Sequence, residues 1–152
     1  MSKKLSRITN YFDGFHLYAI VSHLKDYSLC FHINNKLGFD LVNYEDLVFD
    51  LSGDPNQGFS WYYYKDFKTH THFYLIGNKS EGNILLPSQK TVDFLLLIKD
   101  AIDDNYADET SSAIRKILNI SAVFQADMGK IKDMDLLMET IELHELKFVK
   151  HK

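Results

Sequence analysis

Hydrophobic and polar positions follow two different periods along the chain, and these periods predict where strands and helices lie. Residues 15–21 are rich in aromatic and aliphatic side chains, which is typical of a strand. Over residues 27–37 the apolar positions recur every three or four residues, which predicts one face of a helix. Asp26 and Gly38 flank this pattern and predict the N-cap of the helix and its left-handed C-terminal residue.

The second half of the chain repeats the order of strand, helix and strand. A strongly apolar segment at 92–98 predicts a buried strand, a periodic pattern at 106–118 predicts a helix, and 120–126 predicts the returning strand. Between the halves, residues 59–64 and 69–77 predict an antiparallel strand pair. We therefore expect an α+β fold: a largely antiparallel sheet with two main helices on one face, distantly ferredoxin-like.

Length and composition indicate a single domain over residues 1–152. A chain of 152 residues buries a sizeable core without disulfides or metals, and its 45% of hydrophobic and 25% of charged residues are ordinary for a globular protein. Cys30 is the single cysteine, so no intramolecular disulfide is expected. We expect no cofactor.

Charge and hydropathy narrow the class of partner. The formal net charge of −4 gives no general attraction to phosphate backbones, so no nucleic-acid partner is expected. The longest apolar run, 94–98, is far shorter than the roughly 18 residues of a membrane helix, and the N-terminus lacks a secretory signal. We expect a cytoplasmic protein without a membrane partner.

The segment Leu86-Pro87-Ser88, followed after three residues by Val92-Asp93-Phe94, carries a family resemblance. It resembles the signature of the bacterial IPExxxVDY family, which is Ile-Pro-Glu, three variable residues, then Val-Asp-Tyr. Ser88 replaces the signature Glu and Phe94 the signature Tyr. Supporting matches lie at 22–30 and 78–81.

The resemblance implies domain boundaries and no particular chemistry. It implies a core unit of about residues 10–130, followed by a C-terminal extension at 131–152. Within the signature, Asp93 lies in an apolar run, where a carboxylate needs hydrogen-bond partners. We interpret Asp93 as a side chain that holds backbone N–H groups, with a catalytic or binding carboxylate as the alternative.

Two histidine-containing segments are candidates for chemistry. His70 and His72 alternate on a predicted strand, so both imidazoles would point to one face, where a third ligand would complete a zinc site. Since that third ligand is not identified, we interpret the pair as the polar face of a strand. His23 and Asp26 lie between the first strand and helix, where loops often carry ligands, but helix capping explains them as well.

The run from Trp61 to Tyr64 is the most unusual local feature. On a strand, Trp61 and Tyr63 face one way while Tyr62 and Tyr64 face the other. An uncovered face of large aromatic side chains predicts an interface, whereas helices on both sides would make the same residues part of the core. Both possibilities stay open.

These patterns favour a small non-catalytic binding or protein-interaction module. We expect it to form a homodimer or to bind another protein, with His23, Asp26, Asp93, Trp61, Tyr62 and Tyr64 as candidate contact residues. The alternative is an enzyme with its site at the His23/Asp26 loop or on the His70/His72 strand.

Overall fold

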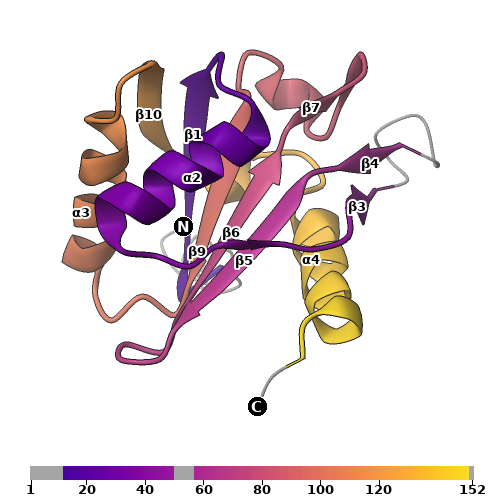
Figure 1. The fold of residues 1–152 in the computed structure, drawn as a ribbon. Helices are drawn as coiled ribbons and strands as arrows, with labels where there is room; N and C mark the ends of the chain where they lie inside the picture. The colour runs from indigo at the N-terminus through magenta and orange to yellow at the C-terminus, as the bar shows by residue number, and fades with distance from the viewer. Residues whose placement is uncertain (1–11, 50–56, 151–152) are drawn as a thin grey trace, which may run out of the picture.

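The computed structural model describes residues 12–49 and 57–150, whose main feature is a six-stranded antiparallel sheet with helices on both faces (Figure 1). The six strands of the sheet are ordered β10-β1-β9-β6-β5-β2. Their bounds are β1 (Phe15–Ser22), β2 (Val42–Asn43), β5 (Trp61–Asp66), β6 (Thr71–Gly77), β9 (Phe94–Lys99) and β10 (Ile120–Ala126). The α+β fold expected from the sequence is confirmed.

The connections between these strands contain shorter elements. Two small antiparallel pairs lie beside the main sheet, β3 (Leu47–Val48) with β4 (Gly58–Phe59) and β7 (Lys79–Ser80) with β8 (Asn83–Ile84). Two short 3-10 turns, η2 (Pro87–Gln89) and η3 (Met128–Lys130), precede β9 and the last helix. Residues 52–58 contain the Gly, Asp, Pro and Asn that are typical of a turn, and most of them lie outside the described residues.

The connections of the inner strands agree with the expected ferredoxin-like character. β9 and β10 both run antiparallel to β1, which lies between them, and the helix α3 (Asp104–Arg115) connects them as a split β-α-β unit. The order β10-β1-β9-β6 is that of a four-stranded ferredoxin-like sheet. β5 and β2 extend this sheet on one side, so β10 is the other edge among the described strands.

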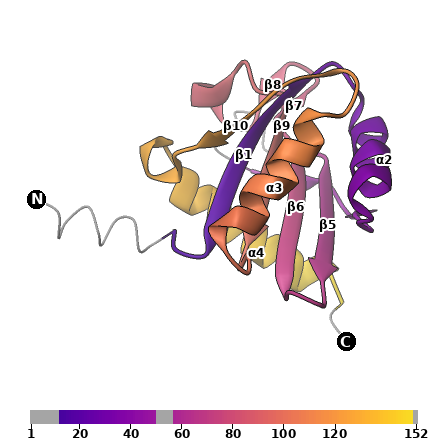
Figure 2. The same ribbon diagram turned by 90° about the vertical axis from the view of Figure 1, so that its left-hand side faces the viewer.

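Helices α2 (Asp26–Leu37) and α3 cover one face of the sheet, as predicted (Figure 2). Leu29 and Ile33 of α2 and Ile114 of α3 are buried against that face. Gly38 ends α2 in the left-handed conformation at φ 70°, and its N–H donates to the Asn34 carbonyl. The N-cap of α2 was predicted wrongly: Lys25 takes that position, and Asp26 is the first helical residue.

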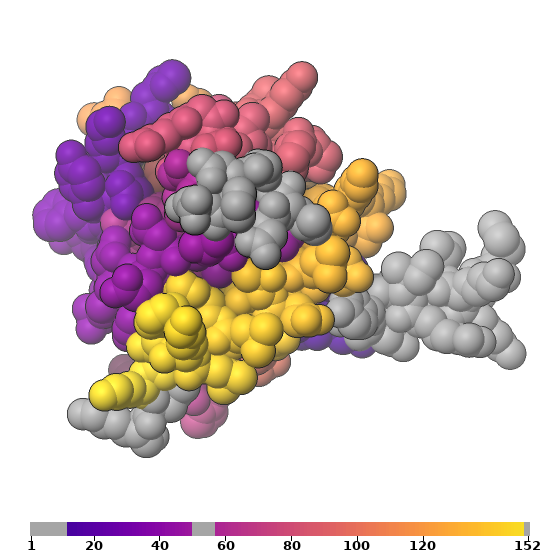
Figure 3. Space-filling view, turned by 90° about the vertical axis from the view of Figure 1, so that its right-hand side faces the viewer, coloured from indigo at the N-terminus to yellow at the C-terminus, as the bar shows by residue number. Residues whose placement is uncertain are grey.

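A third helix, α4 (Met134–Phe148), covers the opposite face of the sheet (Figures 1 and 3). Its apolar positions Met134, Leu137 and Ile141 are buried in the core that contains Trp61. The part of the predicted C-terminal extension that forms α4 is therefore a structural layer of the domain. Among the described helices, none has the length and apolar character that a membrane span requires.

Candidate functional site

His70 and His72, the candidate zinc pair interpreted above as the polar face of a strand, do not share a face. β6 begins at Thr71, and His70 lies in the preceding turn with φ 60°, exposed to solvent. His72 is on the strand, half-buried, and its Nδ1 shares a hydrogen bond of 2.6 Å with the Tyr63 hydroxyl. The expected alternation fails because the left-handed turn residue breaks the extended backbone. Within the described ranges, no three His, Cys, Asp or Glu side chains form a metal-binding group.

His72 belongs instead to a polar cluster beneath α4. Its Nδ1 lies 4.0 Å from the Glu145 carboxylate, and the Tyr74 hydroxyl donates a short hydrogen bond to the same carboxylate. Burial lowers the pKa of His72, and burial followed by the Glu145 hydrogen bond raises the pKa of Tyr74. The cluster joins α4 to the sheet.

The His23/Asp26 loop holds a structural contact. The Asp26 carboxylate accepts a 2.8 Å hydrogen bond from the Tyr62 hydroxyl, which ties the start of α2 to β5. His23 is exposed. Among the described residues, no hydrogen bond or ion pair joins these two residues to His70 or His72.

The aromatic strand β5 is covered on both sides. Trp61 and Tyr63 belong to the core under α4, while Tyr62 belongs to the core under α2 and α3. Trp61 is 0% exposed and Tyr62 is 4% exposed, and only Tyr64 is half-buried. The core explanation therefore holds for Trp61, Tyr62 and Tyr63, and Tyr64 alone of the four aromatic residues keeps part of its surface.

The Asp93 side chain accepts a hydrogen bond from a backbone N–H group, as expected. Its Oδ2 accepts from Ser22 N–H at 2.9 Å and its Oδ1 from Lys79 Nζ at 3.0 Å. Asp93 lies just before β9 and joins the ends of β1 and β9. Beside it, the buried Asn78 side chain donates to the Gln89 and Val92 carbonyls. The polar residues around the family-like motif thus fasten the turn that contains Pro87.

The outer edge of β10 pairs with no other strand in the described structure, so it is available for binding. Ile20 is opposite Val123, yet the Ile20 carbonyl accepts from Asp93 N–H on the β9 side. Ile20 and Val123 are therefore a non-hydrogen-bonded pair, and the backbone groups of Val123 point away from the sheet. Gln125, two residues on, points its N–H and carbonyl the same way.

One backbone group that points outward from this edge, the Val123 carbonyl, already accepts hydrogen bonds. Arg115 at the end of α3 donates from Nε and Nη2 to the Val123 carbonyl, at 3.2 and 2.7 Å. β10 contains no charged residue and no proline along Ile120–Ala126, although both commonly protect edge strands. Its Phe124 side chain is 44% exposed. In the described part of the chain, no other strand pairs with this edge.

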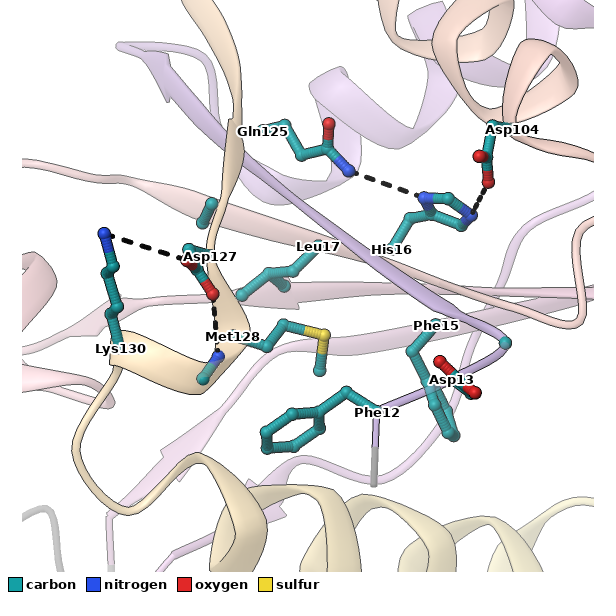
Figure 4. Close-up of a pocket in the computed structure, with 13 residues that line it drawn as sticks. Phe12, Asp13, Phe15, His16, Leu17, Asp104, Gln125, Asp127, Met128 and Lys130 are labelled. Atoms are coloured by element: carbon teal, nitrogen blue, oxygen red, sulfur yellow. Dashed lines mark hydrogen bonds and ion pairs between the residues drawn. The ribbon is translucent and has the colours of Figure 1, made fainter. Parts of the chain in front are cut away.

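A pocket of about 690 Å³, here called the edge pocket, lies at the end of β10 (Figure 4). Its apolar floor is on the α4 side of the sheet and consists of Phe12, Phe15, Leu17, Ala126 and Met128. This volume and this apolar floor are typical of binding pockets. Phe124 projects to the same side, because its pair partner Ala19 belongs to the core under α4.

The polar residues at the rim of the edge pocket lie mainly on the opposite side of β1 from its apolar floor. His16 projects opposite to Leu17, and its ring lies 3.4 Å from Asp104 and 3.5 Å from the Gln125 amide (Figure 4). The Oδ2 atom of Asp127 lies 4.0 Å from the Nζ atom of Lys130. The described residues that line this pocket include no serine, threonine, tyrosine or cysteine, so they offer contacts for binding and no side-chain hydroxyl or thiol nucleophile.

Comparison with known proteins adds no identification. The chain matches no protein-family model, and searches of curated proteins and of solved structures found no match. Function is therefore inferred from geometry alone.

The residues of the β10 edge were not predicted as a site. Val123, Phe124 and Gln125 carry no chemical motif, and whether a strand lies at an edge depends on pairings that are distant in sequence. The one available signal was the absence of charge and proline in 120–126, which is unusual for an edge strand.

Proposed function

We propose that this chain is a non-catalytic protein-interaction module that forms a homodimer by pairing the β10 edges of two copies. The observation that carries the proposal is the edge of β10, which contains no charged residue, pairs with no other described strand and leads into a pocket with an apolar floor. Such an edge is a template for strand addition.

A second copy fits this edge because the strand is complementary to itself. An antiparallel pair with a two-fold axis at Gln125 lets the two Gln125 backbones exchange both of their outward hydrogen bonds. The same register places Phe124 of each copy opposite Ala126 of the other, beside the apolar floor of the edge pocket. No like charges face each other within the paired strands.

The expected dimer is weak. One strand pair and two phenylalanine contacts bury less than a standard interface, so a dissociation constant of roughly 1–100 μM is expected. The Arg115 cap on the Val123 carbonyl weakens the pairing further, since the guanidinium competes with an incoming N–H.

Sedimentation equilibrium over the micromolar range tests the proposal. We expect reversible dimerisation of the wild-type chain, abolished by Gln125→Pro, which removes an outward N–H and leaves the ladder to β1 intact. Phe124→Lys should abolish it too, since a charge on the edge opposes pairing.

Leu143→Lys is the matched control. Leu143 is 59% exposed and lies on α4, outside the β10 edge, so the same charge is added without changing the paired strand. We expect this variant to dimerise like the wild type. A wild-type chain that stays monomeric, or dimerisation lost in Leu143→Lys and kept in Phe124→Lys, would overturn the proposal.

A further inference from the structure

A second pocket lies on the opposite face of the sheet from α4, between the end of α2 and the middle of α3. This α2–α3 groove has a volume of about 490 Å³ and is lined by Leu37 and Gly38 of the first helix end and by Glu109 and Ala113 of α3. It shares no lining residue with the edge pocket.

The floor of the α2–α3 groove is aromatic. Gly38 turns the chain in its left-handed conformation and directs Phe39 onto the sheet. The Phe39 ring lies 5.0 Å from Tyr64 and 4.4 Å from Phe73, measured between ring centroids. Tyr106 of α3 completes the wall, and Phe39, Tyr64 and Tyr106 are all half-buried. Three aromatic rings therefore keep part of their surface at the groove.

Two carboxylates stand at the rim of this aromatic floor. Asp66 accepts from Lys68 N–H at 2.9 Å and from the Tyr106 hydroxyl at 3.1 Å. Burial acts to raise the pKa of Asp66, but these hydrogen bonds outweigh it and lower the pKa, so the carboxylate is ionised at neutral pH. Glu109 is the second carboxylate, and Lys68 is the basic side chain among the lining residues. The rim is thus net negative.

We propose that the α2–α3 groove binds a small organic cation, an alkylated ammonium group held against the Tyr64, Phe39 and Tyr106 rings and beside Asp66 and Glu109. Aromatic faces attract cations through the negative charge of their π-systems, and neighbouring carboxylates add direct attraction. A neutral ligand of the same shape gains only the apolar contact. The site is independent of the β10 edge and does not require the dimer.

The test compares choline with its uncharged isostere 3,3-dimethylbutan-1-ol, by NMR titration of the full chain. We expect choline to bind about three- to thirtyfold more tightly than the alcohol and to shift the amide signals of Tyr64 and Thr110. Tyr64→Leu should weaken choline binding about three- to tenfold and leave the alcohol nearly unchanged. Glu109→Gln, a change at an exposed helix position, should weaken choline binding without a risk to folding.

Leu143→Ala on α4 and Phe124→Lys on β10 are the controls, and both should keep wild-type affinity for choline. The second also separates the two proposals, since it is expected to remove dimerisation alone. No binding of choline, equal binding of the two probes, or unchanged choline affinity in both groove variants would overturn the inference.

Discussion

Asn78 shows how much of this fold depends on one buried amide. Its side chain donates to the Gln89 and Val92 carbonyls and accepts from Leu86 N–H, all within 3.0 Å. These bonds close the turn that leads from β8 into β9 and so position Asp93. A polar side chain that is 0% exposed is tolerated here because its hydrogen bonds are made.

Replacing Asn78 with Ala should lower the free energy of unfolding by about 3 kcal/mol or more, because it leaves buried backbone groups without partners. Urea denaturation measures this loss. Asn35→Ala, at an exposed position of α2, is the control and should change stability by less than about 0.5 kcal/mol. Equal stabilities of the two variants would contradict this account of the turn.

Sequence reasoning identified the role of Asp93 but could not identify its partner. An aspartate in an apolar run predicts a hydrogen-bonded carboxylate. Its donor Ser22 N–H is 71 positions away, and no local pattern links the two residues. The conformation of His70 could not be predicted. It is a left-handed turn residue that is not glycine, and a polar stretch of sequence does not indicate where such a residue lies.

At the scale of elements, α4 is the layer whose importance the sequence understated. The apolar residues Met134, Leu137, Met138 and Ile141 recur at helical spacing in the sequence, and they form the buried face of α4. Its place on the sheet depends on which face α2 and α3 leave uncovered. β10 is a similar case: its bounds at Ile120–Ala126 agree with the prediction, while its edge position follows only from the strand order.

Leu137→Ala should destabilise the protein by about 2–4 kcal/mol, since Leu137 is 1% exposed and the change leaves a cavity in the core under α4. Leu146→Ala is the matched control on the same helix, where the side chain is 77% exposed, and should cost less than about 0.5 kcal/mol. Thermal or urea unfolding compares them. Similar losses would mean that α4 does not pack on the sheet as described.

At the scale of the whole molecule, the half-buried His72 and the buried His144 at the α4–sheet junction make stability depend on pH. Burial lowers the pKa of His72 and of His144, whose Nε2 lies 2.7 Å from the Glu45 carbonyl. In the folded state both imidazoles therefore protonate less readily than in the unfolded chain, where the pKa of histidine is about 6.5. The unfolded chain therefore binds more protons below about pH 6.5, and stability falls as the pH decreases through that value.

The free energy of unfolding should thus fall between about pH 7.5 and 5.5, and the His72→Gln/His144→Gln double variant should show a flatter dependence. His23→Gln, at an exposed loop position, should keep the wild-type slope. An unchanged slope in the double variant would assign the pH dependence to other groups.

The central claim, that two β10 edges pair, is tested most directly by amide hydrogen exchange as a function of protein concentration. The N–H groups of Val123 and Gln125 point away from β1, whereas that of Phe124 is paired within the sheet. We predict that exchange at Val123 and Gln125 slows as the concentration rises, while Phe124 is protected throughout. Fast exchange of Val123 and Gln125 at every concentration would contradict the proposed dimer.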